Sequence, residues 1–151
     1  MATEEFPDSL AAVLAGVQRM VRRRLRQSLT APPLRGAQVE LLRLVAARPG
    51  IRVSAAAKEL YLAGNSVSTL VNQLSRAGYL RRETDPDDRR SGLLLPTQAA
   101  ESRLRDWEAR RSALMHEQVE RLTEEERSAL AAALPALRKL AQNLHEEVEG
   151  T

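Results

Sequence analysis

The feature that most constrains the fold of this chain is a pair of short helical patterns separated by a tight turn. The first pattern covers residues 54–61, with Ser54 as a favourable N-cap. Leu62-Ala63-Gly64 forms the turn, and the second pattern covers about 65–77. A pattern of two short strands around a polar loop follows at once. We therefore expect a segment built as helix, turn, helix and hairpin.

The second of these helices has a side that carries no carboxylate. Asn65 or Ser66 is its expected N-cap, and Gly78 is a typical glycine after a helix end. No acidic residue occurs between Leu60 and Leu80. Asn and Gln side chains can bond adenine edges, and Ser and Thr can contact bases or phosphates. The side predicted to enter the major groove of duplex DNA consists of Asn65, Ser66, Ser68, Thr69, Asn72, Gln73 and Arg76. The alternative is an ordinary solvated face, which usually contains Glu and Lys.

The hairpin is predicted from the strands 79–82 and 92–95, and its connection is too long for a two-residue turn. That connection contains Asp88, Arg89 and Arg90 at a projecting position. An arginine at such a tip can enter a narrow minor groove, where the negative potential is strongest. A neighbouring carboxylate can orient that arginine through a paired contact. Taken alone, the connection would also fit an ordinary charged surface loop.

Longer helical patterns flank this segment. Apolar residues at spacings of three and four predict helices over about 7–28, 35–47 and 97–122. Ile51-Arg52-Val53 is a short β-prone stretch. Thr123 and Glu126 form a capping box that begins the last helix. Pro135 lies inside that helix and is expected to kink it or to split it in two.

Apolar seams at the two ends of the chain predict a homodimer. Spacings of four and three along the last helix form a heptad seam, and the first helix has an apolar stripe of its own. Together they need more partner surface than one small domain offers. The alternative is that the two helices pack on each other within one chain. The residues expected to dimerise are Phe6, Leu10, Leu14, Leu130, Leu134, Leu137, Leu144 and Val148.

Composition excludes several classes of function. The chain has 151 residues and no cysteine, so disulfides, thiolate metal sites and cysteine redox switches are excluded. Two histidines offer little for a metal site, and neither lies near a nucleophile motif, so we expect no enzyme, no metal and no cofactor. No apolar run predicts a membrane span and no secretory signal begins the chain, which predicts a cytoplasmic protein.

Charge is distributed unevenly along the chain. Residues 1–97 hold 15 Lys and Arg against 9 Asp and Glu, a balance of +6, whereas residues 98–151 hold 8 against 11, a balance of −3. A basic front part and an acidic rear part fit a polyanion-binding segment and a separate assembly segment. Chance asymmetry of a solvated surface fits the same numbers about equally well.

The residues 34–100 resemble the MarR family of bacterial transcriptional regulators. The family pattern is matched by Gln38 in the second helix, by Ala56, Ala57 and Leu60 in the third, and by Leu74, Gly78 and Arg82 after the polar face. Its wing sequence appears intact as Asp85-Pro86-Asp87-Asp88-Arg89-Arg90. The Leu-Thr-x-x-Gly that usually follows the wing is replaced here by Pro96-Thr97-Gln98-Ala99-Ala100.

The resemblance implies roles for several residues. In such proteins the wing arginine matching Arg90 enters the minor groove, the aspartate matching Asp88 positions it, and the terminal helices form a two-fold dimer. Members of the family often release DNA when a small anionic or phenolic effector binds near the dimer helices. Arg22, Arg23, Tyr61, Trp107 and His116 are the candidates for such a pocket. Each candidate also has a purely structural alternative. Trp107 would lie in the core, His116 on the surface, and the arginines would be solvated.

We therefore predict a mostly α fold with a small β-hairpin wing (α+β), a winged helix-turn-helix with N- and C-terminal dimerisation helices. Residues 1–151 are expected to form one domain, with a DNA-binding part at 34–97 and helical dimerisation parts at 1–30 and 98–151. Gln38 and Ser54 join the residues expected to contact DNA. The predicted function is repression at a pseudo-palindromic operator in double-stranded DNA. A protein–protein adaptor with the same fold is the competing hypothesis, and the intact Arg89-Arg90 argues against it.

Overall fold

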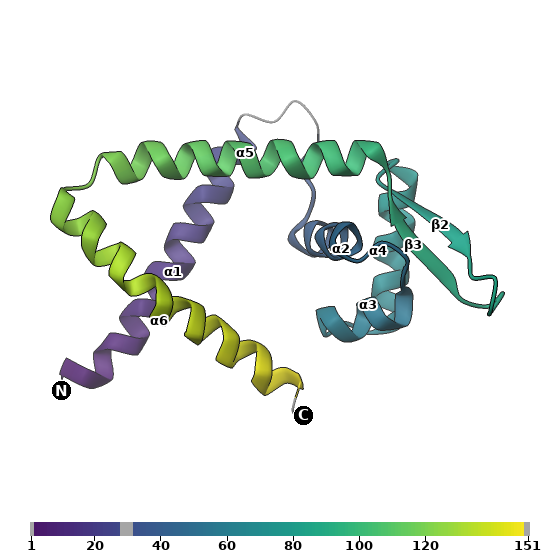
Figure 1. Cartoon of the computed structure of the whole chain (residues 1–151), viewed down its shortest axis with the longest axis horizontal. Helices are drawn as coiled ribbons and strands as arrows, with labels where there is room; N and C mark the ends of the chain where they lie inside the picture. The colour runs from purple at the N-terminus through teal and green to yellow at the C-terminus, as the bar shows by residue number, and fades with distance from the viewer. Residues whose placement is uncertain (1, 28–31, 150–151) are drawn as a thin grey trace. The chain divides into compact units, whose positions relative to one another are not determined.

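The computed structural model describes the chain over residues 2–27 and 32–149, with side chains over 5–27 and 32–146. It divides into two compact units, Met1–Arg111 and Ser112–Thr151. The elements, drawn in Figure 1, are α1 (Ala2–Arg26), α2 (Gly36–Ala47), β1 (Ile51–Arg52), α3 (Val53–Leu60), α4 (Gly64–Arg76), β2 (Leu80–Thr84), β3 (Gly92–Pro96), α5 (Gln98–Glu120) and α6 (Glu124–Glu149). The observed fold is mostly helical with a small antiparallel sheet, as the sequence predicted.

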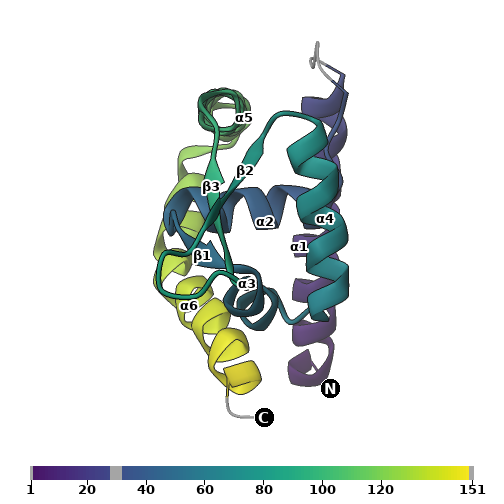
Figure 2. The same ribbon diagram turned by 90° about the vertical axis from the view of Figure 1, so that its right-hand side faces the viewer.

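The core of the first unit lies among α2, α3, α4 and the sheet. These elements bury aliphatic side chains against one another because each helix has one apolar face. Figure 2 shows α4 on one side of the sheet, with α2 crossing behind it. The largest fully buried side chains are those of Leu41, Leu42, Val45, Val67, Val71, Leu74 and Leu94. This core fixes α4 from its inner side and leaves its polar side outward.

The sheet has three antiparallel strands in the order β1-β3-β2. The predicted hairpin is present, with Thr84 opposite Gly92 at its far end and Leu80 opposite Pro96 at its base. The short β-prone stretch predicted at residues 51–53 adds the third strand, because Ile51 pairs with Leu94. Figure 1 shows the β2–β3 hairpin extending away from α2, α3 and α4. Residues 80–96 are called the wing from here on.

Two helix ends follow the sequence prediction closely. Gly78 has a φ of +83°, and the amides of Gly78 and Tyr79 bond the carbonyls of Ser75 and Leu74, which is a Schellman end for α4. At the start of α6 the Glu126 amide bonds Thr123 Oγ1 at 3.2 Å, and the Thr123 amide bonds Glu126 Oε2 at 2.9 Å. This is the predicted capping box.

Two predicted N-caps are wrong. Helix α3 has Arg52 as its N-cap, and Ser54 lies inside its first turn. Helix α4 has Ala63 as its N-cap, so Asn65 and Ser66 are its second and third helical residues. Arg52 and Ala63 both have the extended backbone of an N-cap. Arg52 ends β1 and Ala63 lies in the turn, so each helix begins before the polar residue that was expected to cap it.

The flanking helices also differ from expectation. Helix α1 begins at Ala2 rather than near Pro7 and continues through that proline. Ser28, the predicted end of this helix, lies outside the described residues. Helix α6 continues through Pro135, so of the two expected effects the split into two helices is excluded. A proline removes one backbone hydrogen bond, and the long helical segments on both sides of it remain.

The predicted dimer residues lie largely on exposed faces of α1 and α6. Phe6 is 64% exposed and Leu144 is 61% exposed, and Leu14, Leu130 and Leu134 are also exposed. Leu10 and Leu137 are half-buried, and the side chain of Val148 lies outside the described residues. No helix among residues 2–27 and 32–149 is long and apolar enough to cross a bilayer.

Candidate nucleic-acid interface

The turn between α3 and α4 presents the polar face of α4 to solvent. Tyr61 ends α3 in the left-handed conformation (φ +54°), and the Leu62 amide bonds the Ala57 carbonyl at 3.0 Å. On α4 the side chains of Asn65, Ser66, Thr69, Asn72, Gln73 and Arg76 are exposed, and Ser68 is half-buried. These seven residues are called the recognition face. Ser54 is exposed on the first turn of α3.

Two residues outside α4 hold amides of the recognition face in place. Gln38 Nε2 on α2 donates to Gln73 Oε1 at 3.0 Å, and Gln38 Oε1 accepts the Arg35 amide at 2.9 Å. Arg82 Nη2 on β2 donates to Asn72 Oδ1 at 3.0 Å. The sequence predicts Gln38 as a DNA contact, and the structure places it in a hydrogen bond with Gln73 of the recognition face. The sequence analysis named Arg82 only as a match to the family pattern and assigned it no role in the site.

A buried carboxylate shapes the wing. Asp85 is 4% exposed, forms an ion pair with Arg52 of β1 and accepts the Asp87 amide at 2.9 Å. The Asp87 amide and the nearby Arg52 guanidinium hold the pKa of the Asp85 carboxyl below its ordinary value, although burial alone would raise this pKa. Sequence analysis missed Arg52 and Asp85 as site residues. The intact family motif, which begins at Asp85, was the available signal.

The tip of the wing is arranged by Asp88. Its Oδ1 accepts the backbone amide of Arg90 at 3.0 Å, and its carbonyl accepts the Ser91 amide at 3.0 Å. Asp88 therefore fixes the backbone at Arg90 through its hydrogen bond to the Arg90 amide. Arg89 and Arg90 are exposed, and among the described residues neither forms an ion pair.

A junction connects α5, the wing and the segment before α2. Thr97 Oγ1 donates to the Gly78 carbonyl at 2.6 Å, and the Thr97 amide bonds the Tyr79 carbonyl at 3.1 Å. Arg103 donates to the Tyr79 hydroxyl and the Pro32 carbonyl, and its guanidinium lies 5.1 Å from the centre of the Tyr79 ring. The base of the wing is thereby fixed to α5.

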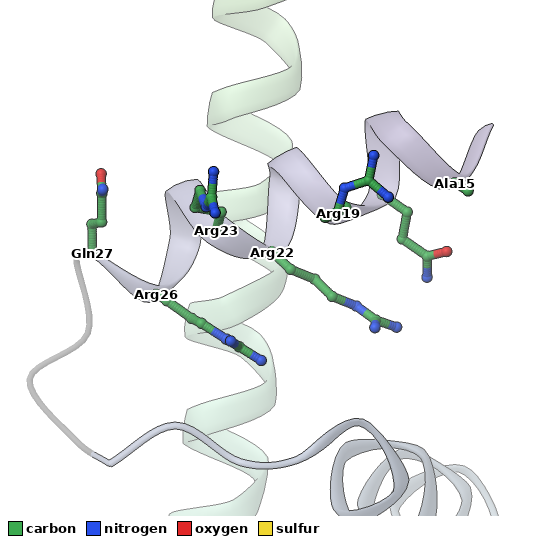
Figure 3. Close-up of a pocket in the computed structure, with 7 residues that line it drawn as sticks. Ala15, Arg19, Arg22, Arg23, Arg26 and Gln27 are labelled. Carbon is green, nitrogen blue, oxygen red and sulfur yellow. The ribbon is translucent and has the colours of Figure 1, made fainter. Parts of the chain in front are cut away.

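A pocket with a strongly basic lining lies along α1 (Figure 3). Its lining residues are Ala15, Gln18, Arg19, Arg22, Arg23, Arg26 and Gln27. Figure 3 shows the side chains of Arg22 and Arg26 extending to the same side of the helix. The lining contains Arg22 and Arg23 of the predicted effector residues, but not Tyr61, Trp107 or His116. Trp107 is half-buried, whereas Tyr61 and His116 are exposed.

Comparisons with known proteins identify the winged segment. The family model described as MarR family matches residues 33–91. YcgE of Bacillus subtilis (strain 168), an uncharacterized HTH-type transcriptional regulator, is 34% identical over 92 residues, which are 61% of this chain and 58% of that protein. The name of this relative describes it as a transcriptional regulator.

Solved structures match the fold over almost the whole chain. FabT of Streptococcus pneumoniae, determined in complex with DNA, aligns with a TM-score of 0.73 and 21% identity over 93% of this chain and 98% of that one. A MarR family protein from Bacillus stearothermophilus aligns with a TM-score of 0.74 and 21% identity over 93% and 96%. The winged helix-turn-helix segment, residues 33–91, is thus similar to the MarR family, and the chain has the fold of these solved structures.

Proposed function

We propose that this chain is a sequence-specific repressor that binds duplex DNA as a homodimer. The recognition face enters the major groove, and Arg90 at the wing tip enters the adjacent minor groove. The observation that carries the proposal is the outward, carboxylate-free face of α4 beside a projecting wing with two unpaired arginines. We propose repression rather than activation because a protein bound to a promoter blocks it without any further interaction.

The charges around the two contact surfaces support this proposal. Arg76 is the one charged residue of the recognition face, so no carboxylate there opposes the phosphate backbone. Three of the four acidic residues of the wing already have partners within it or in β1, because Asp85 is buried against Arg52, Asp88 bonds the Arg90 amide and Glu83 pairs with Arg81. Arg89 and Arg90 thus keep their positive charge for the nucleic acid.

The exposed apolar faces of α1 and α6 support the homodimer. Exposed apolar side chains recur along each helix, such as Leu14 and Val17 on α1 and Leu130 and Leu134 on α6, and contiguous apolar surface of this kind marks an interaction site. A two-fold dimer places two recognition helices on one face of the duplex, about one helical turn apart. The expected operator is therefore a pseudo-palindrome.

The basic pocket on α1 supports the finer proposal of a small anionic or phenolic effector. Arg19, Arg22, Arg23 and Arg26 line it, and none of them forms an ion pair among the described residues. The probe is 4-hydroxybenzoate, a small phenolic anion, tested for release of bound DNA. Arg22→Gln should weaken this release, whereas Arg24→Gln, on the same helix but outside the lining, should not. Equal effects of the two variants would contradict the site.

The proposed function is tested by titrating random-sequence duplex DNA with the purified full-length chain at several salt concentrations. Binding at low salt that weakens steeply as salt rises is expected, because phosphate contacts release counterions. An absence of binding even at low salt would overturn the repressor proposal and favour the protein–protein adaptor.

A further inference from the structure

We propose that Arg103 is a positioning residue that sets the separation between the two half-sites at which the homodimer binds. This inference rests on the proposed function, because it needs a dimer that contacts two half-sites. It goes beyond that function by naming a residue outside the recognition face and the wing that determines which operators are accepted. Arg103 lies on α5, and its side chain is half-buried.

The guanidinium of Arg103 contacts two segments that are distant in the sequence. Its Nη1 donates to the Tyr79 hydroxyl at 2.5 Å, and its Nη2 donates to the Pro32 carbonyl. Its Cζ atom lies 5.1 Å from the centre of the Tyr79 ring, within the range of a cation–π interaction. A planar guanidinium carries several donors in a fixed arrangement, so this one side chain holds both segments at once.

These two segments are the places where the winged part of the chain connects to the proposed dimer helices. The chain enters residues 34–97 from α1 through the segment that contains Pro32, and it leaves them through α5, which leads to α6. Arg103 bonds the first connection to the second. Through Tyr79 it also bonds the short stretch between α4 and β2. Arg103 therefore lies where the position of α4 relative to both connections is set.

The fold has other contacts at this place, so Arg103 adds direction rather than attachment. The Thr97 hydroxyl and amide bond the carbonyls of Gly78 and Tyr79. Ala100 belongs to the core, and Leu104 packs against it. Arg103 acts about 9 Å further along the helix axis than Thr97, at 1.5 Å per residue. Hydrogen bonds are directional, so a second polar contact at this distance restricts the tilt of α5.

The length of α5 makes its direction important for the operator. The helix has 23 residues and is therefore about 35 Å long. A tilt of about 6° at its start moves its far end by roughly 3.5 Å, which is close to the rise of one base pair. An added base pair also rotates one half-site by about 35° around the duplex. Freedom of a few degrees at the Arg103 contacts of both protomers should relieve part of this mismatch.

The experiment compares duplexes that differ only in the separation of their half-sites. Selection from a randomised library first gives the half-site and its separation. Fluorescence anisotropy then gives the Kd of the full-length chain for this duplex and for duplexes with one base pair inserted or removed. The wild type should prefer the selected separation by at least about tenfold, or about 1.4 kcal/mol. Arg103→Gln should reduce this ratio to about threefold or less, because glutamine is shorter and lacks the second donor group.

Matched variants separate positioning from loss of charge or of stability. Arg105→Gln removes the same charge from an exposed position on the same helix and should keep the wild-type ratio. Arg103→Lys keeps an amine that can reach only one partner at a time, and Tyr79→Phe keeps the ring, so both should give intermediate ratios. Lower stability alone would weaken binding to every duplex by the same factor and leave the ratio unchanged. Thermal denaturation verifies that each variant is folded.

The inference is overturned if Arg103→Gln keeps the wild-type ratio or if Arg105→Gln lowers the ratio equally. It is also overturned if the wild type binds all three separations with the same Kd. Each of these results requires binding to paired half-sites, so the proposed function survives it. A wild-type chain that binds none of the duplexes overturns the proposed function and this inference together.

Discussion

At the scale of single residues, Asp85 connects the wing to the rest of the sheet. Its carboxylate joins Arg52 of β1 to the Asp87 amide in the wing connection, and its own amide bonds the Ser91 carbonyl at 3.1 Å. A charged group this deeply buried needs such partners. The position of Arg89 and Arg90 thus depends on a residue that would not itself touch DNA.

We predict that Asp85 makes folding stability depend on pH in the acidic range. Its pKa in the folded protein lies below the ordinary value of 3.8, so the carboxylate stabilises the folded state fully above that value and loses this effect as the pH falls through the lowered pKa. Asp85→Asn should reduce the free energy of unfolding at pH 7 and flatten its decline below about pH 4. Urea denaturation at several pH values measures this.

The matched control for that measurement is Asp87→Asn, which changes an exposed carboxylate in the same connection and keeps the Asp87 amide. We expect it to leave the acid decline close to that of the wild type. Identical pH profiles for Asp85→Asn and the wild type would contradict the structural role of Asp85.

Arg90 gives the prediction for DNA affinity. Arg90→Ala should weaken binding to the selected operator by roughly 1–3 kcal/mol, the scale of one good base or groove contact. Arg89→Ala removes the same charge from the neighbouring residue and should cost less, with a smaller salt dependence as its main effect. Fluorescence anisotropy on labelled operator compares the two. Unchanged affinity in Arg90→Ala would place the wing outside the interface.

At the scale of elements, the end of α4 determines where the wing begins. Gly78 adopts a φ of +83° and the Tyr79 amide bonds the Leu74 carbonyl, so the chain passes from α4 directly into β2. An L-residue in this conformation meets steric repulsion between its Cβ and the backbone.

We predict that Gly78→Ala reduces the free energy of unfolding by about 1–2 kcal/mol, because alanine must adopt the left-handed conformation. Gly64→Ala, in the first turn of α4 with no atom within 4 Å of the added Cβ and no positive φ, is the control and should be neutral or slightly stabilising. Urea denaturation of both variants distinguishes them. An equal loss in both would show that backbone conformation at Gly78 is not the cause.

Local sequence signals predicted the element types but not all of their ends. The apolar periodicities, Gly78 and the Thr123 capping box give correct local structure because each acts within one turn of a helix. The starts of α3 and α4 were misplaced because Arg52 and Ala63 take their extended backbone from the preceding strand and turn. Ser54, Asn65 and Ser66, which were expected as N-caps, therefore lie in the first turns of these helices.

The contacts of the site required tertiary structure. The polar side of α4 is visible in the sequence, but Arg52 and Asp85 are brought together only when β1 joins the sheet through β3. The bonds from Gln38 and Arg82 to α4 likewise join three different elements. No periodicity within one element contains that information.

At the scale of the whole molecule, the account depends on a dimer formed through the exposed faces of α1 and α6. Leu134→Glu should shift the chain toward monomer in sedimentation velocity, because a charge would enter the apolar seam. Ala132→Glu is the matched control, since it lies about 200° around the helix from Leu130 and outside the seam. Dimers of equal strength in both variants would exclude the seam on α6 from the interface.

The central claim is that two copies of the chain bind one duplex through the recognition face and the wing. Selection from a randomised duplex library with the purified wild-type chain tests it most directly. We predict an enriched pseudo-palindrome whose half-sites lie about one helical turn, roughly 10 base pairs, apart. An enriched single half-site occupied by one chain, or no enriched sequence at all, would contradict the account.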